Sequence, residues 1–318
     1  MLTGLSLSSI ALLLVAGIAL DLLLGEARRW HPLVGFGRLA GVIERRLNRG
    51  RALLARGVLA WLLAVVPLSL VAAFFATFFA DFAGLWLHAL LLYFCIGLRS
   101  LRDHTMPIHA ALHTGDLAQA RALTARIVSR DTMHAEEADL AKASAESLLE
   151  NGNDAVFGTL FWFILLGGPG AVLFRLANTL DAMWGYRTAR FNLFGRCAAR
   201  IDDVLNYVPA RLTALSYVLL AGAGRARAWQ CWRTQAPTWS SPNAGPVMAS
   251  GAGALGVSLG GAAVYDGEVE QRPPLGAGPA AQADDIRRAW ALVLHTTLLW
   301  IAVVCTAALL VALGAPSA

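Results

Sequence analysis

Acidic and amide side chains gather in one short stretch of the chain, from Glu146 to Asp154. Glu146 and Glu150 are four residues apart and therefore share one face of a helix. Asp154 follows Asn151-Gly152, a dipeptide typical of turns. Carboxylate oxygens in this pattern are ligands for Mg²⁺, which would present nucleotide phosphates. The competing interpretation is a solvated helix face on which Lys142 pairs with Glu146.

A second polar group lies in a mostly apolar context, from Asn178 to Arg187. An ionised aspartate such as Asp181 is costly there unless it is paired or lines a wet cavity, which favours a functional role. The same argument applies at the start of the next apolar run, to Asp202, Asp203, Asn206 and Arg211. A membrane-interface anchor is the alternative for Arg211.

Small residues form a third feature. The stretch Ser241-Pro242-Asn243-Ala244-Gly245 leads into the Gly-rich and Ala-rich run 251–261. Backbone amides in that run could cradle a phosphate, or the run could pack closely as a helix or loop. Its G-x-G-x-x-G match has no strand pattern before it, so a dinucleotide-binding fold is not predicted. A Walker loop is excluded because Lys142 is the only lysine and no glycine-rich loop precedes it.

Histidines and cysteines give weaker signals. His109 and His113 have metal-ligand spacing on a helix, but the intervening glutamate of a zincin is absent. His31 precedes a proline just after the first apolar run, where it is either a turn residue or an acid–base group. No C-x-x-C pair links the four cysteines, which are predicted to be reduced packing residues: Cys95, Cys197, Cys231 and Cys305.

The chain that positions these groups has 318 residues, of which 57% are hydrophobic and 15% charged. Its mean hydropathy of +0.57 is too high for an ordinary soluble globule. We therefore predict an all-α, polytopic membrane protein with one membrane-embedded domain, residues 1–318, in which spans alternate with polar helices and Gly/Pro-rich loops. The net charge of +5 comes from arginines beside apolar runs, which indicates topology rather than nucleic-acid binding.

Four apolar runs are long enough to cross a bilayer, at about 5–24, 58–80, 82–98 and 294–313, with a turn near Asp81. Polar segments lie at about 25–57, 99–154 and 225–290. The first has eight arginines against two glutamates, which predicts a cytoplasmic location and an external N-terminus. Within the second, Asp116 and Asp131-Thr132 predict the starts of two helices, the later one over 134–150.

Two further apolar runs, 155–176 and 204–221, either span fully or are re-entrant. The first is interrupted by Gly167-Gly168-Pro169-Gly170. If both span, the arginines between them lie outside, against the positive-inside rule, so a cytoplasmic placement is favoured for Arg187, Arg190, Arg196 and Arg200.

Taken in order, these blocks resemble the membrane adenosylcobinamide-phosphate synthase family of cobalamin biosynthesis. The matching stretches run over nearly the whole chain: Asp21 to Gly25 with His31-Pro32, Ser129 to Thr132, Glu146 to Asp154, Asn178 to Arg187, Asp202 through Arg211, and Ser241 to Gly245 through Gly260-Gly261. The chain departs from the family pattern at Trp239, where histidine is common, at Pro246 to Met248 in place of Trp-Pro-Glu, and at Thr159 in place of proline. No acid–base role is predicted at those positions.

The resemblance implies an enzyme that uses ATP to join a carboxyl of adenosylcobyric acid to the amine of aminopropanol phosphate or a close analogue. An activated carboxyl needs Mg²⁺ to neutralise transferring charge and a base for the attacking ammonium. The catalytic candidates are Asp131, Glu146, Glu150, Asn151, Asp154, Asp181, Asp202 and Asp203. Among them, the expected Mg²⁺ ligands are Glu146, Glu150 and Asp181. The expected base is Asp202 or Asp203. Candidates for binding substrate or phosphate are His31, Arg130, Asn178, Arg187, Asn206, Arg211, Ser241, Asn243 and Gly245.

The resemblance also implies the bacterial cytoplasmic (inner) membrane, with the site on its cytoplasmic face, corrinoid and amino-alcohol phosphate substrates, and contact with other late proteins of the pathway. Two other classes compete with this interpretation. A non-catalytic membrane regulator on the same scaffold is disfavoured because nearly every acidic motif residue is retained. A transporter would line its path with Asp181 and the break at Gly167, but no inverted repeat supports it.

Overall fold

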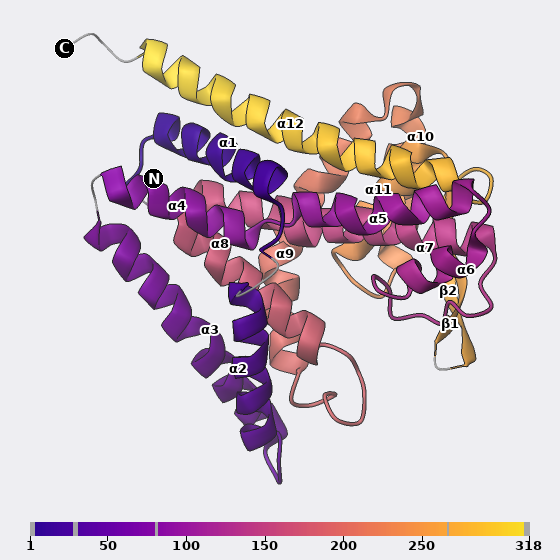
Figure 1. Ribbon diagram of the computed structural model, residues 1–318, viewed down its shortest axis with the longest axis horizontal. Coiled ribbons are helices and arrows are strands. Elements are labelled where there is room, and N and C mark those ends of the chain that lie inside the picture. Colours follow the sequence, from indigo (N-terminus) through magenta and orange to yellow (C-terminus); the bar gives the residue numbers. More distant parts are fainter. Residues whose placement is uncertain (1–3, 28–30, 80–81, 266, 315–318) are drawn as a thin grey trace. The chain divides into compact units, whose positions relative to one another are not determined.

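The structure is a computed structural model that describes residues 4–27, 31–79, 82–265 and 267–314. Arg28, Arg29 and Asp81, on which the charge and turn predictions partly rest, lie outside these ranges. The described chain is almost entirely helical, as predicted, apart from one β-hairpin (Figure 1). It divides into two compact units, the first made of residues 1–97, 158–206 and 301–318 and the second of residues 98–157 and 207–300.

Among the described residues, five helical stretches are long and apolar enough to cross a membrane: Leu7–Leu24, Leu53–Phe78, Ala83–His113, Glu137–Trp184 and Ala283–Gly314. Four of them correspond to the predicted spans, and the stretch Glu137–Trp184 contains the broken run 155–176. The later run, 204–221, lies in α9 (Arg196–Leu220), which is not among the five. The chain is a multi-pass membrane protein.

The first unit contains α1 (Leu7–Leu24), α2 (Pro32–Leu47), α3 (Leu53–Phe78), α4 (Phe82–Cys95), α8 (Gly158–Trp184) and the start of α9. α3 packs against α2 and α8, and α4 packs against α1 and α8. Gly57, Ala60 and Ala64 are buried on α3, and a Cβ atom on Gly57 would lie 2.0 Å from the carbonyl oxygen of Phe194. Small residues of this kind allow close backbone packing, as is common in membranes.

α8 is interrupted at Gly167, whose φ of 65° and ψ of −156° are non-helical. A Cβ atom on Gly170 would lie 2.3 Å from the carbonyl oxygen of Trp162, so the chain folds back on itself across the break. The amide of Gly168 donates a hydrogen bond to Nδ1 of the buried His88, at 2.9 Å. Non-helical backbone is tolerated at membrane depth only when protein groups satisfy it in this way.

The second unit takes over α9 at Tyr207 and ends within the last helix, at Trp300. It also holds the remaining elements. They are α5 (Leu98–His113), α6 (Leu117–Thr124), α7 (Glu137–Gly152), the π-helix η1 (Asn153–Phe157), the short 3₁₀ turns η2 (Gly222–Gly224) and η3 (Ala236–Thr238), α10 (Arg225–Gln235), α11 (Ala244–Leu255), β1 (Ser258–Tyr265), β2 (Glu268–Gly276) and the first part of α12 (Ala283–Gly314). α7 contacts α5, α6, α11 and β1. In Figure 1, α7 lies beside the hairpin, whose strand β1 it contacts.

The antiparallel β1–β2 hairpin was not predicted, because β1 is rich in Gly and Ala and lacks a clear alternation of polar and apolar residues. Its register shifts between Gly260 and Ala262, which marks a β-bulge. Gly260 has a φ of +70°, and a Cβ atom there would lie 2.2 Å from the carbonyl oxygen of Pro273. Only glycine fits this position without strain.

Helix boundaries were predicted with mixed success. Asp116 caps α6, as expected, by accepting a hydrogen bond from the amide of Gln119 at 2.9 Å. The expected cap at Asp131-Thr132 is wrong, because α7 begins at Glu137. Thr132 instead donates to the carbonyl oxygen of Arg121, at 3.1 Å, and so fixes the preceding loop.

The buried Glu44 of α2 fixes the segment between α8 and α9 to the first unit. Its carboxylate accepts two hydrogen bonds from Arg190, at 3.0 and 2.6 Å, and one from Asn48, at 2.7 Å. The bond from Arg190 is the main reason that the pKa of Glu44 lies below its usual value of 4.5. This bidentate geometry positions a guanidinium more strictly than a single contact would.

We predict that this ion pair makes stability depend on pH. Because the pKa of Glu44 is lower in the folded state, its carboxylate stabilises the fold above the unfolded pKa, and this stabilisation disappears as pH falls through the folded pKa. The Tm of the wild type in detergent should therefore fall more steeply than that of Glu44→Gln between about pH 5 and pH 3. Parallel curves would contradict the prediction, and Glu137→Gln, at an exposed position, is the control.

Candidate functional site

The carboxylate of Glu146 is the centre of the polar cluster in the second unit. Glu146 is only 2% exposed, although it lies on the mostly polar helix α7. It forms ion pairs with Arg130 and with Arg272, the latter at 3.2 Å. The amide of Gly260 donates a third contact, at 2.7 Å. A buried carboxylate requires such partners, so this set is a built arrangement rather than a solvated face.

Lys142 does not pair with Glu146, so the solvated-face interpretation is wrong. The ammonium of Lys142 lies 3.2 Å from the carboxylate of Asp139 and donates to the carbonyl oxygen of Ala262, also at 3.2 Å. Asp131, which was predicted to be catalytic, accepts a hydrogen bond from the amide of Gly267 at 2.7 Å. Lys142 therefore attaches the hairpin to α7, and Asp131 attaches it to the loop before α7.

The hairpin contributes Arg272, which sequence reasoning missed. Its guanidinium donates to the carbonyl oxygen of Gly261 at 3.2 Å and lies 5.5 Å from the ring centroid of Trp239. Trp239 is the position at which the resemblance noted in the sequence led us to expect histidine, and here its indole supplies a cation–π contact. The segment around Arg272 carries no sequence signal that separates it from the other arginines.

Glu150 and Asp154 follow Glu146 along the chain, at about one and two helical turns. Glu150 is half-buried. Its carboxyl group interacts electrostatically with four charged neighbours: Asp154, Glu146, Arg130 and Arg272. Asn151-Gly152 does not form the predicted turn, because α7 continues into the π-helix η1, which contains Asp154. Single π turns inside α-helices often occur at functional sites.

Neighbouring amides hold this part of the helix in place. Asn151 donates to the carbonyl oxygen and to Oγ of Ser147, at 2.9 and 3.0 Å. Asn153 donates to Asp154 at 3.0 Å and accepts from the hydroxyl of Thr213, also at 3.0 Å. The orientation of the Asp154 carboxylate is therefore determined by a buried amide.

No group of three or more His, Cys, Asp and Glu side chains that could hold a metal ion occurs within the described ranges. His109 and His113 stack with 5.8 Å between ring centroids, and His109 lies 3.2 Å from Asp284. The Mg²⁺ ligand set Glu146, Glu150 and Asp181 remains a prediction. Its first two members belong to the second unit and Asp181 belongs to the first.

A cavity of about 640 Å³ lies beside this cluster, between the loop that starts at Arg130, α7 and the hairpin. Arg130, His134 and Lys142 contribute nitrogen atoms to its lining, and Asp131 and Asp139 contribute carboxylates. A volume of this size is in the range of small-molecule sites. The cavity could take a ligand that carries an anionic group.

Arg211, Ser241 and Asn243 form a second contact network in this unit. Arg211 donates to Oδ1 of Asn243 at 3.0 Å and to the carbonyl oxygen of Pro242 at 3.1 Å. Its guanidinium lies 3.4 Å from the ring centroid of Tyr207. Oγ of Ser241 accepts from the amide of Ala244 at 3.1 Å, at the start of α11. The predicted binding loop is thus held in one conformation.

The small-residue run 251–261 is divided between the end of α11 and the start of β1, and its glycines favour the close-packing interpretation. A Cβ atom on Gly251 would lie 2.7 Å from Leu149, and one on Gly253 would lie 2.7 Å from the Cα of Ala228. At Gly245 a Cβ atom would lie 2.6 Å from the carbonyl oxygen of Ala236. These glycines allow helices to approach each other.

A separate polar chain runs through the first unit, between α8 and α9. Asp202, which is 7% exposed, accepts from Asn178 at 3.3 Å and from Asn206 at 3.0 Å. Asn178 also accepts from Arg175 at 3.4 Å. The structure thus brings three predicted residues together with Arg175, which sequence reasoning missed. A lone arginine inside an apolar run was the signal that could have found it.

His31 caps α2, and the amide of Leu33 donates to its Nδ1 at 3.3 Å. Burial is the largest cause that lowers the pKa of His31, Glu26 raises this pKa, and Arg175 lowers it. The neutral ring therefore predominates near neutral pH, and its proton resides on Nε2, because Nδ1 is the acceptor. His31 is thus a capping residue whose Nδ1, rather than its Nε2, serves the cap.

The remaining candidates of the first unit are less buried. Asp181 is half-buried, and a Cβ atom on Gly185 would lie 2.0 Å from its Oδ1, so the carboxylate folds over the end of α8. Burial raises the pKa of the half-buried Asp203, while Arg200 and Arg187 lower it. Arg187 itself is exposed. Asp203 is thus a better candidate than Asp181 for a group that gains and loses a proton.

The fold and these clusters define a multi-pass helical membrane protein with buried sites of carboxylate, amide and guanidinium groups. The chain belongs to the CobD/Cbib protein family, whose model matches residues 14–293. This match confirms the resemblance found in the sequence.

Relatives cover the chain almost completely. A cobalamin biosynthesis protein CobD from Stutzerimonas stutzeri is 56% identical over 300 residues, which is 93% of this chain and 97% of the relative. A protein of the same name from Chromobacterium violaceum is 53% identical over 308 residues, which is 95% and 97% of the two chains. One from Rhodobacter capsulatus is 38% identical over 291 residues, which is 89% and 92%. No solved structure gives a significant match.

We predict that Glu146→Ala costs about 3–5 kcal/mol of unfolding free energy, because it leaves Arg130 and Arg272 buried without their counter-charge. Chemical denaturation in detergent measures this loss. Asp139→Asn, which removes an exposed ion pair of the same helix, should cost only about 0–1 kcal/mol. Equal effects of the two substitutions would contradict the central role of Glu146.

Proposed function

We propose that this protein acts in cobalamin biosynthesis as an ATP-dependent acid–amine ligase that joins adenosylcobyric acid to aminopropanol phosphate, or to a close amino-alcohol analogue. The observation that carries the proposal is the 56% identical relative named cobalamin biosynthesis protein CobD, which matches the chain over nearly its full length. The chemistry of such a ligase also suits the buried carboxylates of α7 and the arginines that contact them. The amide-forming step itself is our inference from the family resemblance.

The fit of Mg²⁺ rests on Glu150 and Asp154. Both oxygens of Glu146 are used by Arg130, Arg272 and Gly260, so Glu146 is better suited to hold the site together than to bind a metal. Mg²⁺ in nucleotide sites commonly takes one or two carboxylates and completes its shell with phosphates and water. Glu150 and Asp154 would supply these carboxylates, and bound Mg²⁺ would neutralise charge on the transferring phosphoryl group.

The reaction requires two bond exchanges. The corrinoid carboxylate attacks the γ-phosphorus of ATP, which releases ADP, and the amine then attacks the acyl carbon, which releases phosphate. The amine must first lose a proton, for which the half-buried Asp203 is the favoured base. The 640 Å³ cavity is lined by both signs of charge, and within it Arg130 and Lys142 would contact an anionic group of the substrate.

We further propose that α8 is re-entrant and that the site lies at the cytoplasmic face of the bacterial inner membrane. In support of this, Arg272 of β2 binds Glu146 of α7 directly, which favours placing the polar segments on either side of 158–206 on the same side of the bilayer. The chain between them would then return to that side. The break at Gly167 and the contact between residues 162 and 170 provide a way to return.

Cysteine labelling tests this topology. In a cysteine-free background, Thr188→Cys and Asn192→Cys, both at exposed positions, should be protected from an impermeant maleimide added to whole cells. Arg51→Cys should behave in the same way, because it lies in the basic segment, whereas Ser8→Cys should react. Reaction at position 188 together with protection at position 51 would overturn the re-entrant topology.

An assay of the purified protein in detergent tests the activity. Given adenosylcobyric acid, aminopropanol phosphate and Mg-ATP, it should form adenosylcobinamide phosphate, detected by mass. Glu150→Gln should lower kcat/KM by about 100-fold or more and weaken binding of Mg-ATP, because a charge that faces the metal is lost. Titration calorimetry measures the second effect.

Glu137→Gln, an exposed substitution in the first turn of α7, is the matched control and should retain activity. If the wild type forms no product while a relative does, the ligase function is wrong and a regulatory role becomes the better explanation. If product forms and Glu150→Gln is unaffected in rate and in Mg-ATP binding, only the assignment of the metal ligand is wrong.

A further inference from the structure

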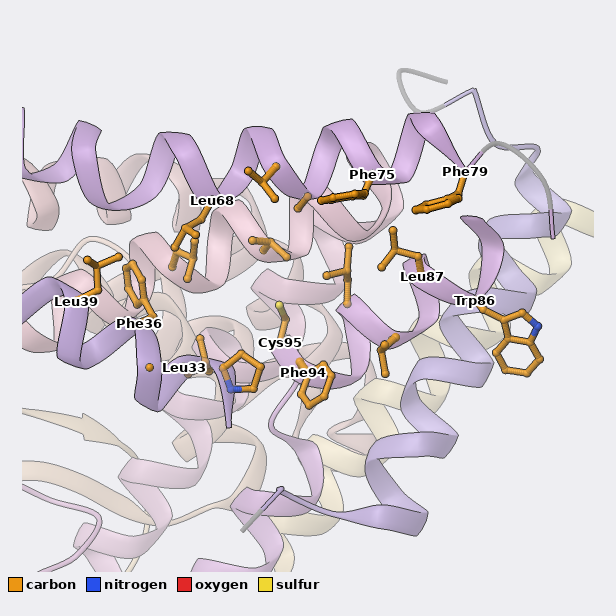
Figure 2. A pocket seen from close by; sticks show the side chains of 18 of the residues that line it. Leu33, Phe36, Leu39, Leu68, Phe75, Phe79, Trp86, Leu87, Phe94 and Cys95 are labelled. Carbon is orange, nitrogen blue, oxygen red and sulfur yellow. The ribbon is translucent and has the colours of Figure 1, made fainter. Parts of the chain in front are cut away.

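An apolar cavity of about 810 Å³ lies within the first unit, apart from the groups that the proposed reaction uses. Its wall includes apolar side chains of three helices (Figure 2): Leu33 and Phe36 of α2, Leu68 and Phe75 of α3, and Leu87 and Phe94 of α4. Val172 and Leu176 of α8 complete the lining. In Figure 2, side chains of α3 face those of α2 and α4 across the cavity.

The chemistry of the lining excludes the polar reactants. None of its residues is charged, and the polar atoms it can offer are limited to the thiol of Cys95 and the indole N–H of Trp86. ATP and amino-alcohol phosphates would lose their hydration there without gaining partners. A long hydrocarbon chain would lose nothing, and burying it in such a cavity is favourable.

The position of the cavity points to the bilayer as the source of that chain. α3 and α4 belong to stretches that are long and apolar enough to span a membrane. Several lining side chains remain substantially exposed, with Val71 at 51% and Phe75 at 44%. In a membrane, these surfaces face lipid tails rather than water.

Polar groups lie close to one part of the cavity wall. The ring of His31 packs edge-on against Phe94, with 6.0 Å between centroids. Arg175, between the lining residues Val172 and Leu176 in sequence, acts electrostatically on both His31 and Cys95. The charge of Arg175, which acts on His31 and on a residue of the cavity wall, and the Nε2–H of His31 match an anionic phosphate attached to a hydrocarbon chain.

We propose that this cavity binds one anionic phospholipid, with an acyl chain among the residues of α2, α3 and α4 and the phosphate held by Arg175 and His31. The lipid is a bound ligand of the first unit, and this binding is independent of the proposed ligase activity.

Native mass spectrometry of the full-length protein tests the proposal, with phosphatidylglycerol and phosphatidylcholine as the probes. One phosphatidylglycerol per chain should be retained in preference to phosphatidylcholine. Gly35 lines the cavity, and a Cβ atom there would meet nothing within 4 Å, so the backbone can carry the ring that Gly35→Phe adds to the cavity. This variant should bind phosphatidylglycerol about tenfold more weakly, a loss of about 1.4 kcal/mol.

Val34→Phe is the matched control, because Val34 is 55% exposed, neighbours Gly35 and does not line the cavity. It should bind lipid like the wild type. Arg175→Met should abolish the preference for the anionic lipid while an acyl chain is still bound. Unchanged retention in Gly35→Phe, or equal retention of both lipids by the wild type, would overturn the proposal. The proposal would also be overturned if Gly35→Phe lost corrinoid binding while it still bound lipid.

Discussion

The buried carboxylate of Glu146 is the interaction on which the second unit depends. A carboxylate that is 2% exposed is stable only when its charge is compensated, and here Arg130, Arg272 and a backbone amide compensate it. These partners come from a loop and a hairpin that are distant from one another in the sequence. Satisfying one buried charge therefore fixes three segments of the chain, and with them the cavity that they line.

The bilayer imposes a second constraint, which acts on the first unit. Backbone groups at membrane depth need partners, so a break such as that at Gly167 is possible only where protein atoms satisfy it. His88 accepts the amide hydrogen of Gly168, and the missing side chain of Gly170 allows the chain to fold back against Trp162. The same glycine-rich sequence in contact with lipid would leave these groups unsatisfied.

Departures from the family pattern are easier to understand in this setting. Where histidine is common in the family, Trp239 places its ring beside Arg272, the residue that also holds Glu146. The substitution replaces a titratable side chain with one that stabilises a cation by its π-face. The network around Glu146 is thus supported at this position without a proton-transferring group. The structure offers no comparable account for Thr159, whose hydroxyl lies in the buried part of α8.

The sequence by itself determined the helical class, the main spans and the acidic blocks, because hydropathy and residue spacing are local properties that require no knowledge of contacts. It also revealed the family, since the blocks keep their order along the chain. It could not determine that Glu146 binds arginines rather than Lys142, that a hairpin of small residues supplies Arg272, or that Arg175 joins Asn178 and Asp202. Each of these is a contact between residues distant in sequence, and a buried charge selects its partners by their position in space. Only the tertiary structure decided them.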